Sequence, residues 1–470
     1  MTPILTIIVL CLIVYFRSIK HSYVVDDIST YKRRHDDPVK FSFKNRIKGG
    51  VPGIIRFIKE RLYGGCSFGL NIEYDNVFRV SLFTLACVLI YLCLGHNTIS
   101  FWAAVLFAVN PINNQLSLWA NARRYLVNVI LVLLMIKFAP LGVLLYFLTP
   151  LFQMTAVFSP ILLGNPWYLL AIPAAVLIGQ KEIRCKIKTR YKIIKDSDRT
   201  EYHPRRLIIT VKQFGHYFFK MIAPGRCAMT YDRLYYWGIT KEGNKDAYAI
   251  NIDFARGILA FIVVGVLYCA LPGIYKSYLL FVVLGTIQWC AVIPVTQDLA
   301  DRYCNLPNVF MMLIVSYLAQ TYLGAYAVTV LLTLAVYYLC YLMIVMRMYR
   351  NIGSYWEYHR FYYPQLPAPR KYEINMLINN RDYMGAWYLV REGLRHSPRE
   401  FILLQQAAVC HKAIGEIGKA RDYANLAMEN YYIGQKETQE PLMKKFLDSL
   451  PKPEPKSRQV RRAEERKNKP

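Results

Sequence analysis

The chain has 470 residues, of which 55% are hydrophobic and only 19% charged, yet its formal net charge is +27. This composition excludes an intrinsically disordered chain and argues against an ordinary soluble nucleic-acid binder, although so large a basic excess by itself suggests an anionic partner. Both facts fit a membrane protein whose apolar residues form spans and whose basic residues lie in loops, and no nucleic-acid partner is expected.

Apolar runs divide most of the chain into candidate membrane helices. They cover residues 3–16, 78–95, 98–110, 124–137, 139–152, 156–179, 207–223, 254–273, 276–295, 308–321 and 324–347. Because roughly 20 apolar residues cross a bilayer, we predict an all-α fold with a polytopic membrane domain of about 11 helices over residues 1–350. No small-residue cleavage site follows the first run, which is therefore interpreted as a retained span.

The charge of the loops predicts the topology. The segment 181–206 is densely basic, and the positive-inside rule places it in the cytoplasm. Alternation of the spans then places the N-terminus in the cytoplasm and exports the 28–77 loop, residues 296–307 and everything after residue 347. The 28–77 loop and the C-terminal tail are also basic, but long loops are translocated largely regardless of charge.

The character of the chain changes after Arg350. We interpret residues 351–369 as a linker, residues 370–434 as two helical repeats and residues 451–470 as a basic, disordered tail. Within the repeats, Ala386 and Gly393 are followed 34 residues later by Ala420 and Ala427. Small residues at this spacing are typical of tetratricopeptide repeats. The expected core is formed by Tyr383, Trp387, Leu394, Leu404, Tyr423 and Leu426.

The 11 cysteines form no Cys-x-x-Cys pair and no cluster with histidine, so neither a disulfide framework nor a zinc site is expected. Two adjacent carboxylates, Asp26 and Asp27, lie just beyond the first span. Carboxylates at a membrane boundary are costly unless they are solvated, paired or functional. They are therefore either simply solvated at the interface or act as a general base with a neighbour that orients it or binds a cation.

A second polar stretch, residues 110–125, lies between the third and fourth spans. It contains Asn110, Gln115, Trp119, Arg123 and Arg124. Amides, an aromatic ring and paired arginines suit the binding of a sugar or a phosphate, because the guanidinium fork matches phosphate oxygens. The alternative is a belt of side chains that extend to the membrane surface.

A third polar stretch, residues 298–307, contains Asp301, Arg302 and Tyr303. Asp301 and Arg302 form a structural pair, or Arg302 and Tyr303 bind a phosphate. The predicted topology brings all three polar stretches to the same face of the membrane. A pocket on that face is therefore the leading hypothesis for a functional site.

The order of these features resembles the transmembrane and tetratricopeptide-repeat-containing glycosyltransferases of the GT-C superfamily, which are related to protein O-mannosyltransferases. That family has an acidic pair after the first span and a stretch of the form FAxHPxxxExxxWxxxR after the third. It also has an AERYxYLP element, to which ADRYCNLP at residues 300–307 is similar. Weaker matches are found at residues 153–160, 229–232 and 350–356. The ordered matches extend over about 330 residues and precede the repeats, as in the family.

The sequence departs from the family at several positions where the family has ionisable residues. The histidine and glutamate of the second element are Asn110 and Gln115 here, and a Lys-Glu pair is replaced by Gln153 and Met154. Amides still hydrogen-bond sugar hydroxyls, but they cannot serve as general acids or bases.

The resemblance implies an inverting transfer of a sugar from a polyprenyl-phosphate carrier to an extracytoplasmic acceptor. Asp26 would deprotonate the acceptor hydroxyl, while Asp27 orients it or helps to hold a divalent cation such as Mg²⁺ or Mn²⁺. The carrier phosphate would be bound by basic and phenolic groups, and the other substrate contacts made by amide, indole and carboxylate groups. The expected phosphate-binding residues are Arg123, Arg124, Arg302 and Tyr303, and the expected substrate-binding residues are Asn110, Gln115, Trp119 and Asp301.

A protein hydroxyl, presented to the enzyme by the repeats, is the expected acceptor, and a bacterial inner membrane is the expected location, with site and repeats outside the cytoplasm. Two alternatives remain open: modification of a surface glycan or lipid, and a catalytically decayed scaffold that recruits proteins through its repeats. A transporter is a further class. Against it, we find no inverted repeat of broken helices and no charged residue in the middle of a span.

Overall fold

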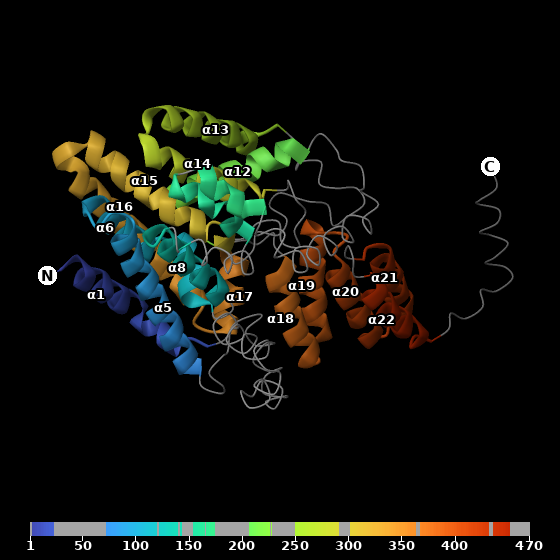
Figure 1. Ribbon diagram of the computed structural model, residues 1–470. Coiled ribbons are helices and arrows are strands. Elements are labelled where there is room, and N and C mark those ends of the chain that lie inside the picture. The colour runs from blue at the N-terminus through green and yellow to red at the C-terminus, as the bar shows by residue number, and fades with distance from the viewer. Residues whose placement is uncertain are drawn as a thin grey trace, which may run out of the picture. The chain divides into compact units, whose positions relative to one another are not determined.

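The computed structural model describes residues 2–22, 72–119, 122–139, 142, 154–164, 166–173, 206–225, 227, 250–290, 301–362, 367–431 and 436–451. Within these residues the regular structure is entirely helical, with no strand (Figure 1). The predicted all-α class is thus confirmed for the described part of the chain. The chain divides into two compact units, an N-terminal unit (1–362) and a C-terminal unit (363–470), and each is described by itself.

Helices of very different length make up the N-terminal unit. In chain order they are α1 (Pro3–Tyr15), η1 (Phe16–Lys20), α5 (Ile72–Cys93), α6 (Thr98–Val109), η2 (Pro111–Asn113), α7 (Asn114–Leu118), α8 (Arg123–Lys137), η4 (Met154–Leu163), η5 (Pro166–Leu170), α12 (Arg206–Ile222), α13 (Ile252–Ala270), α14 (Gly273–Ile287), η7 (Asp301–Tyr303), α15 (Asn305–Tyr322), η8 (Gly324–Tyr326), α16 (Ala327–Met348) and α17 (Ile352–Tyr362).

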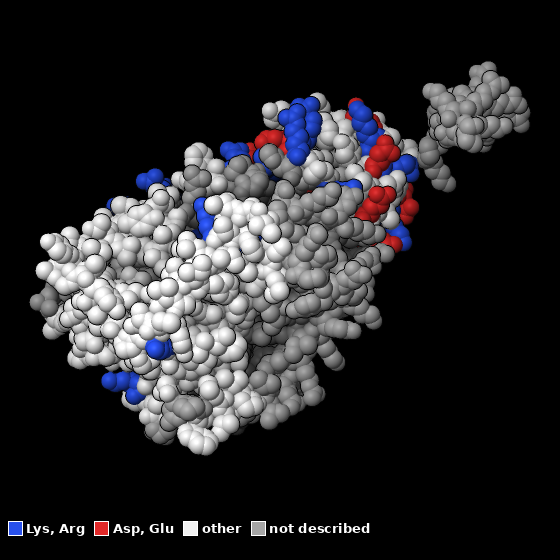
Figure 2. All heavy atoms as spheres, turned by 90° about the horizontal axis from the view of Figure 1, so that it is seen from above, with Lys and Arg blue, Asp and Glu red and all other residues white. Residues whose placement is uncertain are grey.

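Four helical segments among the described residues are long and apolar enough to cross a membrane. They are Pro3–Lys20, Ile72–Cys93, Ile252–Ala270 and Gly324–Met348. Shorter apolar helices cover Thr98–Val109, Tyr125–Lys137 and Gly273–Ile287. Figure 2, which looks onto the side of α13, shows few charged side chains on the described surface there. These properties are those of a membrane protein, and the predicted total of about 11 spans stays a prediction.

Local sequence explains where the helices turn. Between α5 and α6 the backbone has a positive φ at Gly95 (119°) and at His96 (52°). Asn97 then begins α6 through a capping box, in which its Oδ1 accepts from the Ser100 backbone N–H at 2.9 Å and its own N–H donates to Ser100 Oγ at 3.0 Å. These bonds satisfy amide groups that a helix start leaves without partners.

Two glycines allow α12 and α13 to cross closely. A Cβ atom placed on Gly215 would lie 2.6 Å from the Gly257 Cα atom, and one on Gly257 would lie 2.5 Å from Val211 Cγ1. Real Cβ atoms do not approach other atoms so closely, so the crossing requires glycine at both positions. Figure 1 shows the two helices side by side.

The described residues of the C-terminal unit form five helices in a row. They are α18 (Pro367–Asn379), α19 (Tyr383–His396), α20 (Phe401–Ala413), α21 (Ile417–Glu429) and α22 (Lys436–Asp448). The starts of α18 and α20 are 34 residues apart, as are those of α19 and α21. The geometry therefore has the period seen in the sequence, while its assignment to the tetratricopeptide family stays a prediction.

The small residues of this unit lie where helices pack. Ala386, Ala420 and Ala427 are fully buried, and a Cβ atom on Gly393 would lie 2.9 Å from Leu403 Cδ1. Of the expected core, Leu404 is fully buried, Tyr383 is half-buried, and Trp387, Leu394, Tyr423 and Leu426 pack partly buried against the two hydrophobic clusters.

The segment interpreted as a linker contains a helix. Residues 352–362 form α17. The Tyr355 ring of this helix contacts the Tyr349 ring at the end of α16, and the two ring centroids are 6.3 Å apart. Tyr355, Tyr358 and His359 are buried. The aromatic residues of this segment thus give it a packing face that its weak hydropathy does not indicate.

Candidate functional site

Helix ends far apart in the sequence meet at one end of the N-terminal unit. The Tyr15 hydroxyl at the end of α1 donates to the Ala108 carbonyl near the end of α6 at 2.7 Å. Asn110 Nδ2, just after α6, donates to the Met221 carbonyl at the end of α12 at 2.9 Å. The buried polar side chains gathered here are called the polar cluster below: Asp75, Arg79, Asn110, Asn114, Gln115, Arg123, Lys220, Asp301, Arg302 and Tyr349.

The corner after α6 is held by an asparagine amide. Asn110 precedes a proline, which favours an extended backbone and ends the helix. Its Oδ1 atom accepts from the Ile112 N–H at 3.0 Å, while its Nδ2 atom binds the end of α12 as described above. Both sides of this fully buried amide are thus used to hold the corner. Asn110 was predicted from sequence to bind substrate, and in the structure its amide joins two helix ends.

Asn114 connects three segments of the chain. Its Oδ1 atom accepts a hydrogen bond from the Tyr349 hydroxyl at 2.7 Å, and its Nδ2 atom donates to the Pro111 carbonyl at 2.7 Å. Nδ2 also lies 3.5 Å from Asp301 Oδ2, which is a long contact. The amide therefore joins the end of α16 and the turn η7 to the second polar stretch.

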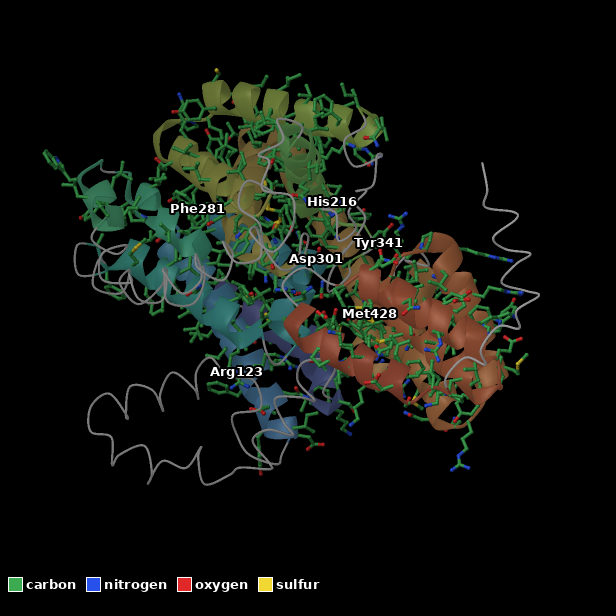
Figure 3. The ribbon with its side chains drawn as sticks, turned by 90° about the vertical axis from the view of Figure 1, so that its right-hand side faces the viewer. Arg123, His216, Phe281, Asp301, Tyr341 and Met428 are labelled. Carbon is green, nitrogen blue, oxygen red and sulfur yellow. The ribbon has the colours of Figure 1, made fainter. Side chains whose placement is uncertain are left out.

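Asp301 is part of a buried ion pair. Its Oδ1 atom lies 2.9 Å from Lys220 Nζ, which comes from the last turn of α12. Figure 3 shows Asp301 in the interior of the N-terminal unit, surrounded by side chains of several helices. Burial raises the pKa of Asp301 above its usual value, and the nearby Lys220 ammonium opposes that rise.

Arg302 lies against two aromatic rings and an amide. Its guanidinium carbon is 5.6 Å from the ring centroid of Trp119 and 5.0 Å from that of Tyr303, within the range of cation–π attraction. Its Nη1 atom lies 3.5 Å from Gln115 Oε1. Tyr303 in turn stacks on Trp289 with ring centroids 4.1 Å apart. The second and third polar stretches are thus in direct contact through Arg302.

Arg123 forms a second buried ion pair. Its Nη2 atom lies 3.0 Å from Asp75 Oδ1, both side chains have no exposed surface, and the Phe78 ring lies 5.1 Å from the guanidinium. Arg79, one turn after Asp75 on α5, donates from Nε to the Ser117 carbonyl at 2.8 Å. These contacts fix the start of α5 to the second polar stretch. Figure 3 shows Arg123 at the edge of this region.

The first span and α5 are joined next to the polar cluster. Asn76 Nδ2 donates to the Ile19 carbonyl at 2.8 Å and to the His21 carbonyl at 2.9 Å. Burial, and then the positive charges of Arg79 and Arg350, lower the pKa of His21 to about 4. The chain on both sides of residues 23–71 is therefore anchored at this end of the unit.

Seven of the predicted site residues lie together in this region. They are Asn110, Gln115, Trp119, Arg123, Asp301, Arg302 and Tyr303. Asp26, Asp27 and the side chain of Arg124 lie outside the described residues. Among the residues that the structure describes, no group of three or more histidine, cysteine or acidic side chains could hold a metal ion.

Sequence reasoning missed Asp75, Arg79 and Lys220. The first two are four residues apart at the start of α5, where charge interrupts the apolar run, and this spacing places them on one helix face. On α12, Lys212, His216 and Lys220 are also spaced by four, and Lys212 is 1% exposed. The expectation that no charged residue lies in the middle of an apolar run is therefore wrong for residues 207–223, because this stripe faces the interior.

The comparisons with known proteins gave no match. No known family, no curated protein and no solved structure is significantly similar to this chain.

Proposed function

We propose that the protein is an integral-membrane inverting glycosyltransferase of GT-C type, which transfers a sugar from a polyprenyl-phosphate carrier to a protein hydroxyl. The observation that carries the proposal is the contact between the two polar stretches whose residues resemble that family. Arg302 lies beside Gln115 and Asp301 beside Asn114, each pair separated by 187 residues. Substrate sites are often built where such distant polar groups converge among apolar helices.

Asp26 is the proposed general base. It follows Ser22 by four residues, and an extended chain spans at most about 3.6 Å per residue. The Ser22 N–H donates to the Arg350 carbonyl at 3.1 Å beside the polar cluster. Chain length therefore keeps Asp26 within about 14 Å of that anchor. In the proposed reaction Asp26 accepts the proton of the acceptor hydroxyl as its oxygen attacks the anomeric carbon, and Asp27 orients the base or helps to hold a divalent cation.

Arg302 and Tyr303 are the best supported candidates for the carrier phosphate. The phosphate gains negative charge as its bond to the sugar breaks, and a guanidinium in a desolvated setting stabilises that charge. Arg123 has Asp75 as a carboxylate partner at 3.0 Å, and the two side chains have no exposed surface. We therefore assign Arg123 a positioning role, and Arg124 remains a candidate on its sequence alone. Trp119, Gln115 and Asp301 would surround the sugar.

The remaining parts of the proposal concern architecture. We propose about 11 membrane spans, a tetratricopeptide module that binds the polypeptide acceptor, and a bacterial inner membrane with the site and the module on its outer side. The 34-residue offset of the helix pairs supports the module. Several successive helices either end or start at the polar cluster. This arrangement supports the proposal that the polar stretches lie at the same face of the membrane.

A catalytically decayed scaffold is the second candidate, and one observation favours it. Asn110 and Gln115, which replace ionisable residues of the family, are fully buried, and the Asn110 amide is bonded to backbone on both sides. A site that had lost its chemistry would keep such structural bonds. A transferase that modifies a glycan or lipid would share the same reaction and differ only in acceptor.

The variant Asp26→Asn tests the proposal in cells that express the full chain. Proteins and lipid extracts from their membranes would be compared by mass spectrometry for hexose or pentose additions. The matched control is Asp36→Asn, because Asp36 and Asp37 form another acidic pair ten residues further along the chain. We expect Asp26→Asn to abolish a protein-linked sugar and Asp36→Asn to retain it. Loss of a lipid-linked or polysaccharide-linked sugar instead would assign the acceptor to the alternative class, and no change would favour the scaffold.

Arg302→Gln tests the phosphate assignment separately. Removal of a charge that acts on the leaving group is expected to lower transfer about 10²–10³-fold. Immunoblots of the membrane fraction verify equal amounts of each variant. Full activity of Arg302→Gln would refute the assignment without refuting the general base.

A further inference from the structure

The C-terminal unit contains a pocket that plays no part in the proposed transfer reaction. It has a volume of about 470 Å³ and lies where the start of α19, the end of α20 and the start of α21 meet. Its lining includes Met384, Trp387, His411, Glu416, Lys419 and Tyr423. Small-ligand sites generally have volumes of about 300–1,000 Å³ and combine apolar walls with a few polar groups.

Three aromatic rings form one wall of the pocket. The His411 ring is stacked on Tyr423 with centroids 5.2 Å apart and an interplanar angle of 6°. Trp387 lies 4.3 Å from the His411 ring and 5.6 Å from the Tyr423 ring. The Trp387 ring is inclined by 60° to the His411 ring and by 61° to the Tyr423 ring, so the wall is an apolar corner between aromatic rings.

On the polar side of the pocket, the negative charge of Glu416 is balanced by a neighbouring basic group. Glu416 Oε2 lies 2.6 Å from His411 Nδ1, and Glu416 Oε1 lies 3.0 Å from Lys419 Nζ. The hydrogen bonds from Lys419 and His411 hold the pKa of Glu416 below its usual value, so the carboxylate is ionised at neutral pH. Its charge is already balanced by Lys419, while both groups still have free hydrogen-bonding positions.

His411 adds a second sign of a ligand. Its side chain is 2% exposed, and its Nε2 atom has no hydrogen-bond partner among the described residues. With Nδ1 bonded to the carboxylate, Nε2 is the ring atom left to bond a ligand, as an acceptor in the neutral ring or as a donor in the protonated one. A buried polar atom without a partner is costly. A donor bound in the pocket, or a water held by the ligand, would remove that cost.

These features select the class of ligand. A cation would find no uncompensated carboxylate, and an anion would find no uncompensated ammonium. A purely apolar group would cover the aromatic wall but leave the donors and acceptors beside it without partners, which is unfavourable. A neutral molecule with one apolar face and a hydroxylated edge meets both requirements.

We propose that this pocket binds a single sugar ring, which packs into the apolar corner between Trp387 and Tyr423 and whose hydroxyls bond to Glu416 and Lys419. The glycan could be free or attached to a protein or lipid, since the pocket recognises only the ring. This proposal does not depend on the transferase activity, and it holds whether or not Asp26 is catalytic.

Saturation-transfer NMR with the full chain in phosphatidylcholine nanodiscs tests the proposal, because these contain no sugar-headed detergent. The probes are the methyl glycosides of glucose, galactose, mannose and N-acetylglucosamine. A ligand of about a dozen non-hydrogen atoms is expected to bind at millimolar concentrations. We expect magnetisation transfer to the ring protons of at least one of the four glycosides.

Two matched variants locate the site. Met384→Trp fills the pocket from a side chain that is 63% exposed, whereas Tyr388→Trp adds an indole elsewhere on α19 at a position 61% exposed. Neither substitution disturbs the core. We expect Met384→Trp to reduce the transfer at least fivefold and Tyr388→Trp to leave it unchanged.

Several results would overturn the proposal. The first is that none of the four glycosides shows magnetisation transfer, and the second is that the transfer is equal for Met384→Trp and the wild type. The third is that Met384→Trp reduces magnetisation transfer to tetramethylammonium or N-acetyltyrosinamide but not to any glycoside. The last result would instead assign the pocket to a cation or to an aromatic side chain.

Discussion

The buried ion pair between Asp75 and Arg123 gives a quantitative test of how the polar cluster is held together. Both side chains have no exposed surface, and the charged atoms are 3.0 Å apart. At an effective dielectric constant of about 20, two unit charges at that distance attract by about 5–6 kcal/mol. Much of this attraction offsets the loss of hydration, so the pair as a whole contributes little net stability.

Removal of one partner has a different effect, because the other charge stays buried and loses its partner in this ion pair. We expect Asp75→Asn and Arg123→Met each to lower the free energy of unfolding by about 3–5 kcal/mol. The double variant removes both charges of the pair. Its loss of free energy of unfolding is therefore expected to be clearly smaller than the sum of the losses of the two single variants. The difference between the sum and the double variant measures the coupling of the pair.

The measurement is the loss of helical circular dichroism as the mole fraction of dodecyl sulfate is raised in mixed micelles, under conditions where refolding is complete. Arg256→Met is the matched control, because Arg256 pairs with Asp253 at 3.3 Å but is 64% exposed. This substitution is expected to change stability by less than about 1 kcal/mol. The reasoning would be refuted if the single variants of the buried pair lost no more free energy of unfolding than Arg256→Met. It would also be refuted if the loss of the double variant equalled the sum of the two single losses.

Three further predictions use the same unfolding measurement. Burial lowers the pKa of His359 to about 4, whereas a histidine in the unfolded chain has a pKa of about 6.5. Between these two pH values the unfolded chain binds more protons than the folded protein. The free energy of unfolding therefore falls as the pH falls from about 6.5 towards 4. Between pH 7 and pH 5 the wild type should lose about 2 kcal/mol more than His359→Phe, and equal losses would contradict this assignment. Gly257→Ala should lower stability by about 1–3 kcal/mol because its Cβ atom meets Val211, whereas Gly265→Ala on the same helix, where the added atom meets nothing within 4 Å, should be neutral or slightly stabilising. Asn97→Ala removes the capping box of α6 and should cost about 1 kcal/mol; no change would show that the cap is dispensable.

Much of the helical arrangement can be predicted from sequence because strong stop signals bound the apolar runs. The run predicted over 98–110 becomes α6 (Thr98–Val109), which lies between a capping asparagine and an Asn-Pro corner. The start of α5 was predicted too late, at residue 78. Its first turns contain Glu73, Asp75 and Arg79, which lower the hydropathy although two of them are buried. A composition window cannot distinguish a charged residue in solvent from one in an interior ion pair.

The convergence of the polar stretches was also predictable, but their partners were not. Alternation of spans places residues 110–125 and 298–307 at the same end of the helices without any knowledge of packing. The pairing of Asp301 with Arg302 was one of two interpretations, and the structure instead pairs Asp301 with Lys220. Adjacent residues of a helical turn point in different directions, so a partner from another helix is favoured. Only the ion pair between the last turn of α12 and η7 reveals which one.

The charge balance of the polar cluster bears on its ligand. The cluster contains the basic residues Arg79, Arg123, Lys220 and Arg302, and the carboxylates Asp75 and Asp301. Burial first, and then the positive charges of Arg79 in the cluster and of Arg350 beside it, lower the pKa of the neighbouring His21 to about 4. A buried excess of positive charge is unfavourable unless negative charge joins it. In the proposed enzyme, the carrier phosphate would supply that negative charge. Part of the basic excess of the chain thus lies inside the protein, as the proposed binding of an anionic substrate group requires.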